Sequence, residues 1–287
     1  MVIKQIYTGC LAQGAYYIES NGEVAIIDPL REVQDYIERA EKNKAKIRYI
    51  FETHFHADFV SGHVTLAEKT GGKIIFGPNA KTKFDSHIAT DGEVFQLGDI
   101  TITAIHTPGH TMESTTYLLK DKNGKDNAIF TGDTLFLGDV GRPDLAQKSS
   151  MTQEDLAATL FDSLRTKIMP LANDVIVYPA HGAGSACGKN LSKETVGTLG
   201  DQKQHNYALR KDMTKDEFIK EVTQGLLPPP AYFPLNVALN KEGYKSIDEV
   251  IKTGAKALSA NDFELVANET GAESAFAPVF ITSSIDL

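Results

Sequence analysis

The densest group of metal-binding side chains in this sequence lies in the segment FETHFHADFVSGH, residues 51–63. His54, His56 and Asp58 stand two residues apart, so their side chains point to the same side of an extended chain. Ionisable groups gathered on one face are costly in a protein interior unless they are paired or bind a metal ion. Because imidazole and carboxylate are ligands for zinc and iron, the pattern predicts a metal site rather than a polar loop.

Three further residues of the same kinds follow other apolar runs. His110 comes after ITITAI and a Pro-Gly turn, Asp133 follows NAIFTG, and His181 follows DVIVYPA. His54 itself follows the run IRYIFET. In open α/β sheets the ligand crevice lies beyond the carboxyl ends of the strands. We therefore expect these four side chains to converge on a single site.

Short apolar runs alternate with amphipathic runs through roughly the first 225 residues. Strands are predicted at 24–30, 47–54, 73–78, 100–110, 114–120, 127–133 and 174–181. Helices are predicted at 31–44, 61–71 and 149–168, the last opening with a Ser/Thr cap and acidic residues in its first turn. This alternation predicts an α/β layered fold with buried sheets.

The composition changes at GLLPPPAYFPLN, residues 225–236, where consecutive prolines favour an extended segment. The later runs SIDEVIKTG and ALSANDFELVANETG predict small helices, and APVFITSSIDL predicts a strand. We therefore divide the chain into a main domain at 1–225 and a Pro-rich linker with a C-terminal appendage at 226–287. The appendage is too short for a core of its own, so we expect it to pack on the main domain.

Charge and apolar content exclude several kinds of partner. The 287 residues carry a formal net charge of −9 without a long basic run, so nucleic acid, which rewards clustered Lys and Arg, is not expected. No run approaches the about 20 apolar residues that span a bilayer, so no membrane contact is expected. The N-terminal residues lack the apolar core of a signal peptide, and Cys10 and Cys187 form no CxxC pair. We therefore expect a cytoplasmic protein.

The motifs THFHAD, HTPGHT, TGD and YPAHG, in this order, resemble those of the metallo-β-lactamase superfamily over roughly residues 1–225. The resemblance implies a four-layered αββα sandwich with a metal site at the sheet edges. Hydrolytic members such as glyoxalase II carry THxHxDH. In those members the first two histidines and the third-motif histidine bind one metal, and the Asp-His pair and the fourth-motif histidine bind a second. The later aspartate bridges the two metals.

Phe59 stands in this chain where those hydrolases have the second-site histidine. Its ring has no lone pair, so the second metal loses a ligand and a mononuclear site is the simplest consequence. A hydrolase with one zinc remains open, since zinc needs only three protein ligands and a water. Two histidines and one carboxylate with open positions are also the facial triad of non-haem Fe(II) oxygenases. His54, His110 and Asp133 can supply that triad.

A branch of the superfamily, the persulfide dioxygenases, binds one iron through the first histidine of HxHxD, the third-motif histidine and the later aspartate. The resemblance therefore implies one Fe(II) per chain, with zinc able to substitute, bound by His54, His110 and Asp133. Branch members fused to a rhodanese sulfurtransferase also carry HADF in place of HADH. The remaining residues of the motifs would orient ligands or metal-bound water, namely His56 and Asp58, or would line the pocket, namely His181.

Four more residues are predicted to contact the substrate. GDTLFLGDVGRPDL resembles the branch's loop after the iron-binding aspartate, in which Arg142 would help to hold an anionic substrate. AHGAGSACGK resembles the rhodanese-fused members, and Tyr178 lies just before it. Cys187 either reacts with persulfide, as a thiolate favoured by Lys189 or by a helix N-terminus, or packs as an inert small residue.

The expected substrates are a low-molecular-weight thiol persulfide, of glutathione or coenzyme A, and O2, with sulfite and free thiol as products. One alternative is a glyoxalase II-like zinc thioester hydrolase, which needs the ligand that Phe59 does not provide. Another is a non-catalytic persulfide-sensing or sulfur-carrying protein, with Cys187 as its working residue. A homo-oligomer is expected, as in relatives of this kind. The tail resembles only the opening of a rhodanese domain, and no cysteine follows Cys187, so sulfurtransferase activity is not expected.

Overall fold

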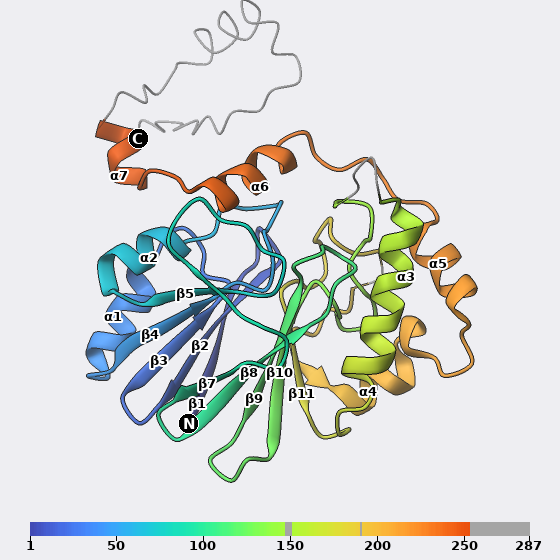
Figure 1. Ribbon diagram of the computed structural model, residues 1–287, viewed down its shortest axis with the longest axis horizontal. Helices are drawn as coiled ribbons and strands as arrows, with labels where there is room; N and C mark the ends of the chain where they lie inside the picture. Colours follow the sequence, from blue (N-terminus) through green and yellow to red (C-terminus); the bar gives the residue numbers. More distant parts are fainter. Residues whose placement is uncertain (147–150, 190, 253–287) are drawn as a thin grey trace, which may run out of the picture.

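The computed structural model describes residues 1–146, 151–189 and 191–252. Within these ranges, two six-stranded sheets lie face to face, with helices on both outer sides (Figure 1). The strand order is β1-β2-β3-β4-β5-β6 in the first sheet and β12-β11-β10-β9-β8-β7 in the second. The four-layered αββα architecture predicted from the sequence is confirmed.

The first sheet consists of β1 (Val2–Thr8), β2 (Gln13–Ser20), β3 (Glu23–Ile27), β4 (Lys46–Phe51), β5 (Lys73–Phe76) and β6 (His87–Ile88). The second consists of β7 (Val94–Leu97), β8 (Ile100–His106), β9 (Thr115–Lys120), β10 (Asp126–Gly132), β11 (Ile176–Pro179) and β12 (Gly197–Thr198). The helices are α1 (Gln34–Lys42), α2 (His63–Thr70), α3 (Gln153–Ser163), α4 (Leu199–His205), α5 (Lys215–Thr223), α6 (Phe233–Glu242) and α7 (Ile247–Lys252). A π-helical turn, Leu164–Ile168, continues α3, and a 3-10 turn, Tyr207–Leu209, follows α4.

Three apolar clusters separate the four layers. Phe51, Tyr117 and Phe130 belong to the cluster between the two sheets. A second cluster packs the first sheet against α1 and α2, and a third packs the second sheet against α3 and α5. Central strands such as β3 and β10 are therefore buried on both faces, which explains why they read as continuous apolar runs rather than alternating ones.

The linker differs from its prediction. The prolines at 228–230 precede a helix, α6, where an extended segment was expected through residue 236. Pro234 lies in the first turn of α6, where a missing N–H costs nothing because that N–H has no partner within the helix. Figure 1 shows α6 lying across the ends of the sheets, over the loops that follow the strands. The predicted helix and strand of the far tail lie outside the described residues, because the description ends at residue 252.

The predicted start of α3 is also confirmed. Thr152 caps α3 in a reciprocal capping box with Asp155, as the Ser/Thr and acidic residues predicted. Among the described residues, no helix has both the length and the apolar character that a membrane crossing requires.

Candidate metal centre

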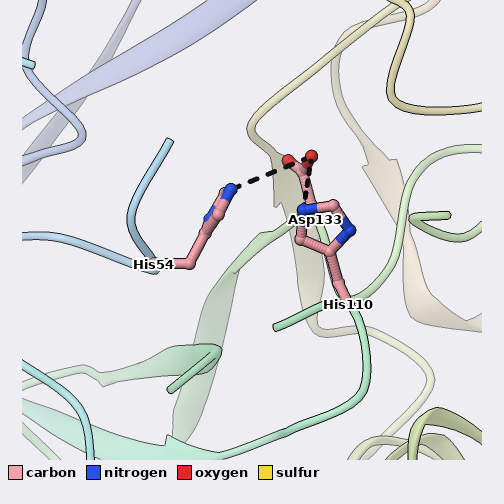
Figure 2. A group of neighbouring side chains, drawn as sticks. All are labelled: His54, His110 and Asp133. Carbon is pink, nitrogen blue, oxygen red and sulfur yellow. Dashed lines mark ion pairs between the residues drawn. The ribbon is translucent and has the colours of Figure 1, made fainter. Parts of the chain in front are cut away.

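His54, His110 and Asp133 meet at the edge of the sheets, just beyond β4, β8 and β10 (Figure 2). Nε2 of His54 lies 4.0 Å, and Nε2 of His110 lies 3.4 Å, from Oδ2 of Asp133. One ligand atom from each residue lies within 4.8 Å of those of the other two. All three side chains are buried. The structure therefore brings together the three residues that the strand ends suggested.

The end of β10 is shaped to bring Asp133 close to His54. The pairing of β10 with β11 shifts register between Phe130 and Gly132, and such an irregularity re-aims the side chain that follows it. Gly132 has φ +53°, and a Cβ there would lie 2.6 Å from the Cβ of Thr53. Only glycine permits both this conformation and this close approach. The strand end can therefore lie directly beside the residue that precedes His54.

The turn before His110 is fixed against a helix. Gly109 has φ +141°, and a Cβ there would lie 2.4 Å from the Cα of Leu160 in α3. The hydroxyl of Ser163, also in α3, donates a hydrogen bond of 2.7 Å to the carbonyl of Pro108. The Pro-Gly turn predicted from the sequence thus packs against α3, which holds the backbone of His110 in place.

Hydrogen bonds set which nitrogen of His54 carries the proton. The hydroxyl of Thr53 lies 2.8 Å from Asp28 Oδ2 and 3.0 Å from His54 Nδ1. An ionised carboxylate can only accept, so the hydroxyl donates to Asp28 and Nδ1–H of His54 donates to the hydroxyl. Burial, followed by the charges of neighbouring histidines, holds the pKa of His54 well below its usual value. His54 is therefore neutral, and Nε2 presents a lone pair toward Asp133.

The same logic applies to the two other histidines beside Asp133. Nδ1 of His110 donates to the carbonyl of Arg142 over 2.8 Å, and Nδ1 of His181 donates to the carbonyl of Ala12 over 3.2 Å. Backbone carbonyls only accept, so Nδ1 carries a proton in both rings and Nε2 is the nitrogen left to face a metal ion. Nε2 of His181 lies 3.6 Å from Oδ1 of Asp133. Three Nε2 atoms thus surround one carboxylate.

This arrangement of acceptors fits a cation. Both carboxylate oxygens of Asp133 are buried without a hydrogen-bond partner among the described residues, and so is Nε2 of His181. A buried carboxylate that lacks donors and faces nitrogen lone pairs is strongly destabilising unless a positive charge lies between them. The donor set of imidazole nitrogens and a carboxylate suits zinc or iron. The residues present therefore fit a metal ion at this position.

His56 is placed differently from its neighbour two residues earlier. Nε2 of His56 lies 3.2 Å from Asp28 Oδ1 and 3.6 Å from Glu52 Oε2, both of them buried. Burial alone would lower the pKa of His56, but the charge and hydrogen bond of Asp28 and the charge of Glu52 raise this pKa to about 9. The ring of Phe59 lies over the ring of His56, with centroids 4.3 Å apart. His56 thus tethers the loop to the carboxylates beneath it.

A second group of ligand-type residues nevertheless lies beside the first. One ligand atom each from His56, Asp58 and His181 come within 4.8 Å of one another, and Nε2 of His181 is 3.4 Å from Asp58 Oδ2. His181 lies against these carboxylates rather than in the lining of the cavities described below. The structure thus places His181 beside Asp58 and Asp133, and its predicted place in the pocket lining stays a prediction.

Cys187 lies at the centre, but its surroundings do not favour a thiolate. One ligand atom each from Asp133, His181 and Cys187 lie within 4.8 Å of one another, and the thiol is buried. Burial, and then the charges of Asp133 and Asp58, raise the pKa of Cys187 well above its usual value. Nζ of Lys189 donates to the carbonyls of Glu221 and Gln224 at the end of α5. Lys189 therefore caps a helix, and its ammonium is directed to these carbonyls; of the two alternatives for Cys187, the burial of the thiol agrees better with a packing residue.

Arg142 is already paired in the folded protein. Its Nε and Nη2 donate to both carboxylate oxygens of Asp144 over 2.7 Å, and Nη2 also donates to the carbonyl of Leu227 over 2.6 Å. Its backbone carbonyl accepts the hydrogen bond from His110. Arg142 thus ties the loop after β10 to the linker and orients a ligand candidate, in place of the free anion-binding charge that we expected.

Tyr178 is also placed differently from its prediction. Its ring stacks on Phe130 with centroids 5.2 Å apart and lies against Tyr16 at the same distance, in the layer between the sheets. It is part of neither cavity described below. Tyr178 is therefore a packing residue in this structure, because the alternation along β11 directs it toward the opposite sheet.

Asn240, on α6, is a site residue that sequence reasoning missed. Its side-chain amide nitrogen donates to the carbonyls of His56 and Phe59 over 2.8 and 2.9 Å, and its oxygen accepts from the backbone N–H of Ser61 over 2.9 Å. The side chain is buried. Asn240 therefore binds the loop that follows His54. In the sequence Asn240 stands between Leu239 and Lys241, and an asparagine in that setting gives no sign of a role.

Two cavities lie near the centre. One of about 330 Å³ includes His110 in its lining, together with Phe55, Glu113 and Lys241. The other, of about 440 Å³, is lined by the loop after β10, including Arg142, by residues on both sides of Cys187, and by the start of the linker, including Leu227 and Pro228. The smaller cavity is the one that reaches a ligand candidate directly.

The family model described as the metallo-beta-lactamase superfamily matches residues 8–181. The chain belongs to this superfamily. Its members bind metal ions and include enzymes, which agrees with the converging His and Asp side chains. The resemblance stated from the four motifs is thereby confirmed.

Relatives within the superfamily carry two different activities. Hydroxyacylglutathione hydrolase, cytoplasmic, from Arabidopsis thaliana is 31% identical over 184 residues, covering 62% of this chain and 67% of that protein. Persulfide dioxygenase ETHE1, mitochondrial, from Homo sapiens is 28% identical over 220 residues, covering 76% of this chain and 78% of that protein. The crystal structure of a metallo-beta-lactamase from Staphylococcus aureus subsp. aureus COL matches with a TM-score of 0.78 and 32% identity, covering 86% of this chain and 73% of that one.

Proposed function

We propose that this chain is a mononuclear Fe(II) persulfide dioxygenase, with His54, His110 and Asp133 as the iron ligands. The observation that carries the proposal is the contrast between the two ligand groups. The first has a complete donor set with lone pairs aimed at one point. In the second, Phe59 stands on the face of His56, where the hydrolases have a histidine ligand. Two histidines and one carboxylate are the donor set of non-haem Fe(II) oxygenases.

Bound there, Fe(II) would supply the redox chemistry by which one O2 and one water convert R–S–SH into R–SH and sulfite. The chain's own residues prepare the place for it. Thr53 and the carbonyl of Arg142 hold the Nδ1–H of His54 and His110, which keeps Nε2 free in both rings. Burial of all three ligand candidates limits the access of bulk water to the reacting sulfur.

The relatives agree with a small thiol compound as substrate. The human protein is named for persulfide oxidation and the Arabidopsis protein for hydrolysis of an acylated glutathione. We propose a persulfide of a low-molecular-weight thiol such as glutathione or coenzyme A, acted on in the cytoplasm by a homo-oligomer. We also propose that residues 1–225 form the catalytic domain and that the 226–287 appendage completes it through α6, whose Asn240 holds the ligand loop.

A zinc thioester hydrolase is the second candidate function. The observation that favours it is that His56, Asp58 and His181 still lie close enough together to share a metal ion. It has one ligand fewer than the THxHxDH hydrolases, because Phe59 stands where they have a histidine. A non-catalytic sulfur carrier that works through Cys187 is a third reading, and the burial of that thiol disfavours it.

The test compares two substrates on one preparation loaded with either metal. Iron-loaded protein should consume O2 and release an equal amount of sulfite when given glutathione persulfide or coenzyme A persulfide. Zinc-loaded protein should consume none. Hydrolysis of a hydroxyacylglutathione by the zinc form, with no oxygen uptake by the iron form, would favour the hydrolase instead.

A further inference from the structure

The cavity that reaches His110 is bounded by parts of the chain far apart in sequence. Its volume is about 330 Å³. The first-motif loop contributes Phe55, the turn after His110 contributes Glu113, and α6 contributes Lys241. A substrate whose sulfur lies at the metal centre would extend into this space. The walls of the cavity therefore contact the thiol carrier rather than the reacting atoms.

Two side chains of opposite charge lie in this lining. Apart from His110, they are the only ionisable side chains that the described part of the lining contains. Both flank the same residue. Nζ of Lys241 lies 5.0 Å from the centroid of the Phe55 ring, and Oε1 of Glu113 accepts a hydrogen bond of 3.3 Å from the backbone N–H of Phe55.

Among the described residues, neither charge has a partner of opposite charge. Within the described residues, no carboxylate forms an ion pair with Lys241 and no cation forms one with Glu113. Oε2 of Glu113 makes no hydrogen bond to a described residue. Both side chains are partly buried, so a ligand between them would bind in surroundings where charge pairs are screened less than at the open surface. A cation and an anion on one cavity wall complement a ligand that carries both charges close together.

We propose that Lys241 and Glu113 recognise the α-amino-acid group of the thiol carrier, Lys241 binding its carboxylate and Glu113 its ammonium. The inference rests on the proposed function and narrows its substrate to the persulfide of an amino acid or short peptide, such as cysteine or glutathione. Coenzyme A has no such group. A cavity of about 330 Å³ is also at the small end for ligand sites, and a nucleotide needs more room.

The first experiment measures binding without turnover. The probes are S-methylglutathione, its des-amino analogue carrying a glutaryl group, and S-methyl coenzyme A, titrated into the metal-loaded chain by calorimetry. Lys241→Met keeps the packing on Phe55 and removes the charge, and Glu113→Gln keeps an acceptor for the Phe55 N–H. The control is Lys245→Met, because Lys245 is exposed and is used only through its backbone carbonyl.

Each of the two variants should raise the Kd for S-methylglutathione about tenfold, as expected for the loss of one charge-assisted hydrogen bond. The control, Lys245→Met, should leave this Kd unchanged. Glu113→Gln should leave the des-amino analogue unaffected, because that analogue has no ammonium to lose. Tighter binding of S-methyl coenzyme A than of S-methylglutathione, or unchanged affinity in both variants, would overturn the proposal.

Oxygen uptake separates this inference from the proposed function. With glutathione persulfide, both variants should raise KM about tenfold and leave kcat within about twofold, because neither residue touches the reacting sulfur. A wild-type protein that oxidises no persulfide defeats the dioxygenase proposal, whereas the calorimetry still decides the zwitterion site. A fall in kcat at unchanged KM would count against recognition of the carrier by these two residues.

Discussion

Replacing Asn240 by alanine should loosen the loop that follows His54. The substitution removes three hydrogen bonds to that loop and leaves the carbonyls of His56 and Phe59 and the N–H of Ser61 without their partner. A buried backbone group left unpaired costs about 1–3 kcal/mol. Three such groups would together cost about 3–9 kcal/mol. Since water can reach part of a loosened loop, we expect the free energy of unfolding to fall by an amount near the low end of this range, about 3–5 kcal/mol.

The same chain offers a matched control in the same helix. Asn236 donates one hydrogen bond, to the carbonyl of Ala57, and is only partly buried. Asn236→Ala should therefore cost no more than about 1.5 kcal/mol. At roughly 2 °C or more per kcal/mol for a chain of this size, Asn240→Ala should lower Tm by about 6–10 °C and the control by about 3 °C.

Circular dichroism on melting gives Tm, and hydrogen exchange read by mass spectrometry locates the change. Exchange in residues 56–61 and in α6 should rise in Asn240→Ala, while β10 and β11 keep their protection. The reasoning would be refuted if Asn240→Ala lowered Tm no more than Asn236→Ala, or if the loop exchanged at the wild-type rate. Either result would mean that α6 does not hold the loop in solution.

Three further predictions concern the metal centre and the cysteines. Removing the metal with a chelator should lower Tm, since a metal that binds only the folded state stabilises it. In Asp133→Asn, melts with and without the chelator should give the same Tm. In protein loaded with zinc in place of iron, Phe59→His should raise zinc content from about one toward two per chain by elemental analysis, because it adds a donor beside Asp58; an unchanged ratio would mean that the second group cannot hold a metal. Under native conditions iodoacetamide should alkylate Cys10, which is exposed, well before Cys187, which is buried, and peptide mass spectrometry that found Cys187 modified first would contradict the described burial.

The convergence of the ligand candidates was predictable because their cause is local in the sequence. Asp133 directly follows a buried strand, and His54 and His181 follow others within three residues, so topology alone brings them to one edge. The core strands were equally readable, because strands buried on both faces are continuous apolar runs. β1 was missed because an edge strand is half exposed, and β2 because its sequence mixes Gly, Ala and Glu with its aromatics.

What the sequence did not show depends on contacts between distant segments. Asn240 lies more than 180 residues from the carbonyls that it binds, and Lys241 meets Phe55 across a similar separation. The hydrophobic periodicity of a sequence does not indicate contacts between segments so far apart. Arg142 differs, because its partner Asp144 is only two residues away and the pairing was readable from the sequence. Its predicted contact with the substrate stays a prediction.

Metal content tests the central claim most directly. The chain should be purified without oxygen and analysed for iron and zinc, alongside His54→Ala, Asp133→Ala and the matched variant His87→Ala. His87 pairs with Glu93, outside the centre. The account predicts about one iron per wild-type chain, the same in His87→Ala, and almost none in the other two variants. Two zinc ions per chain, or iron retained after loss of Asp133, would contradict it.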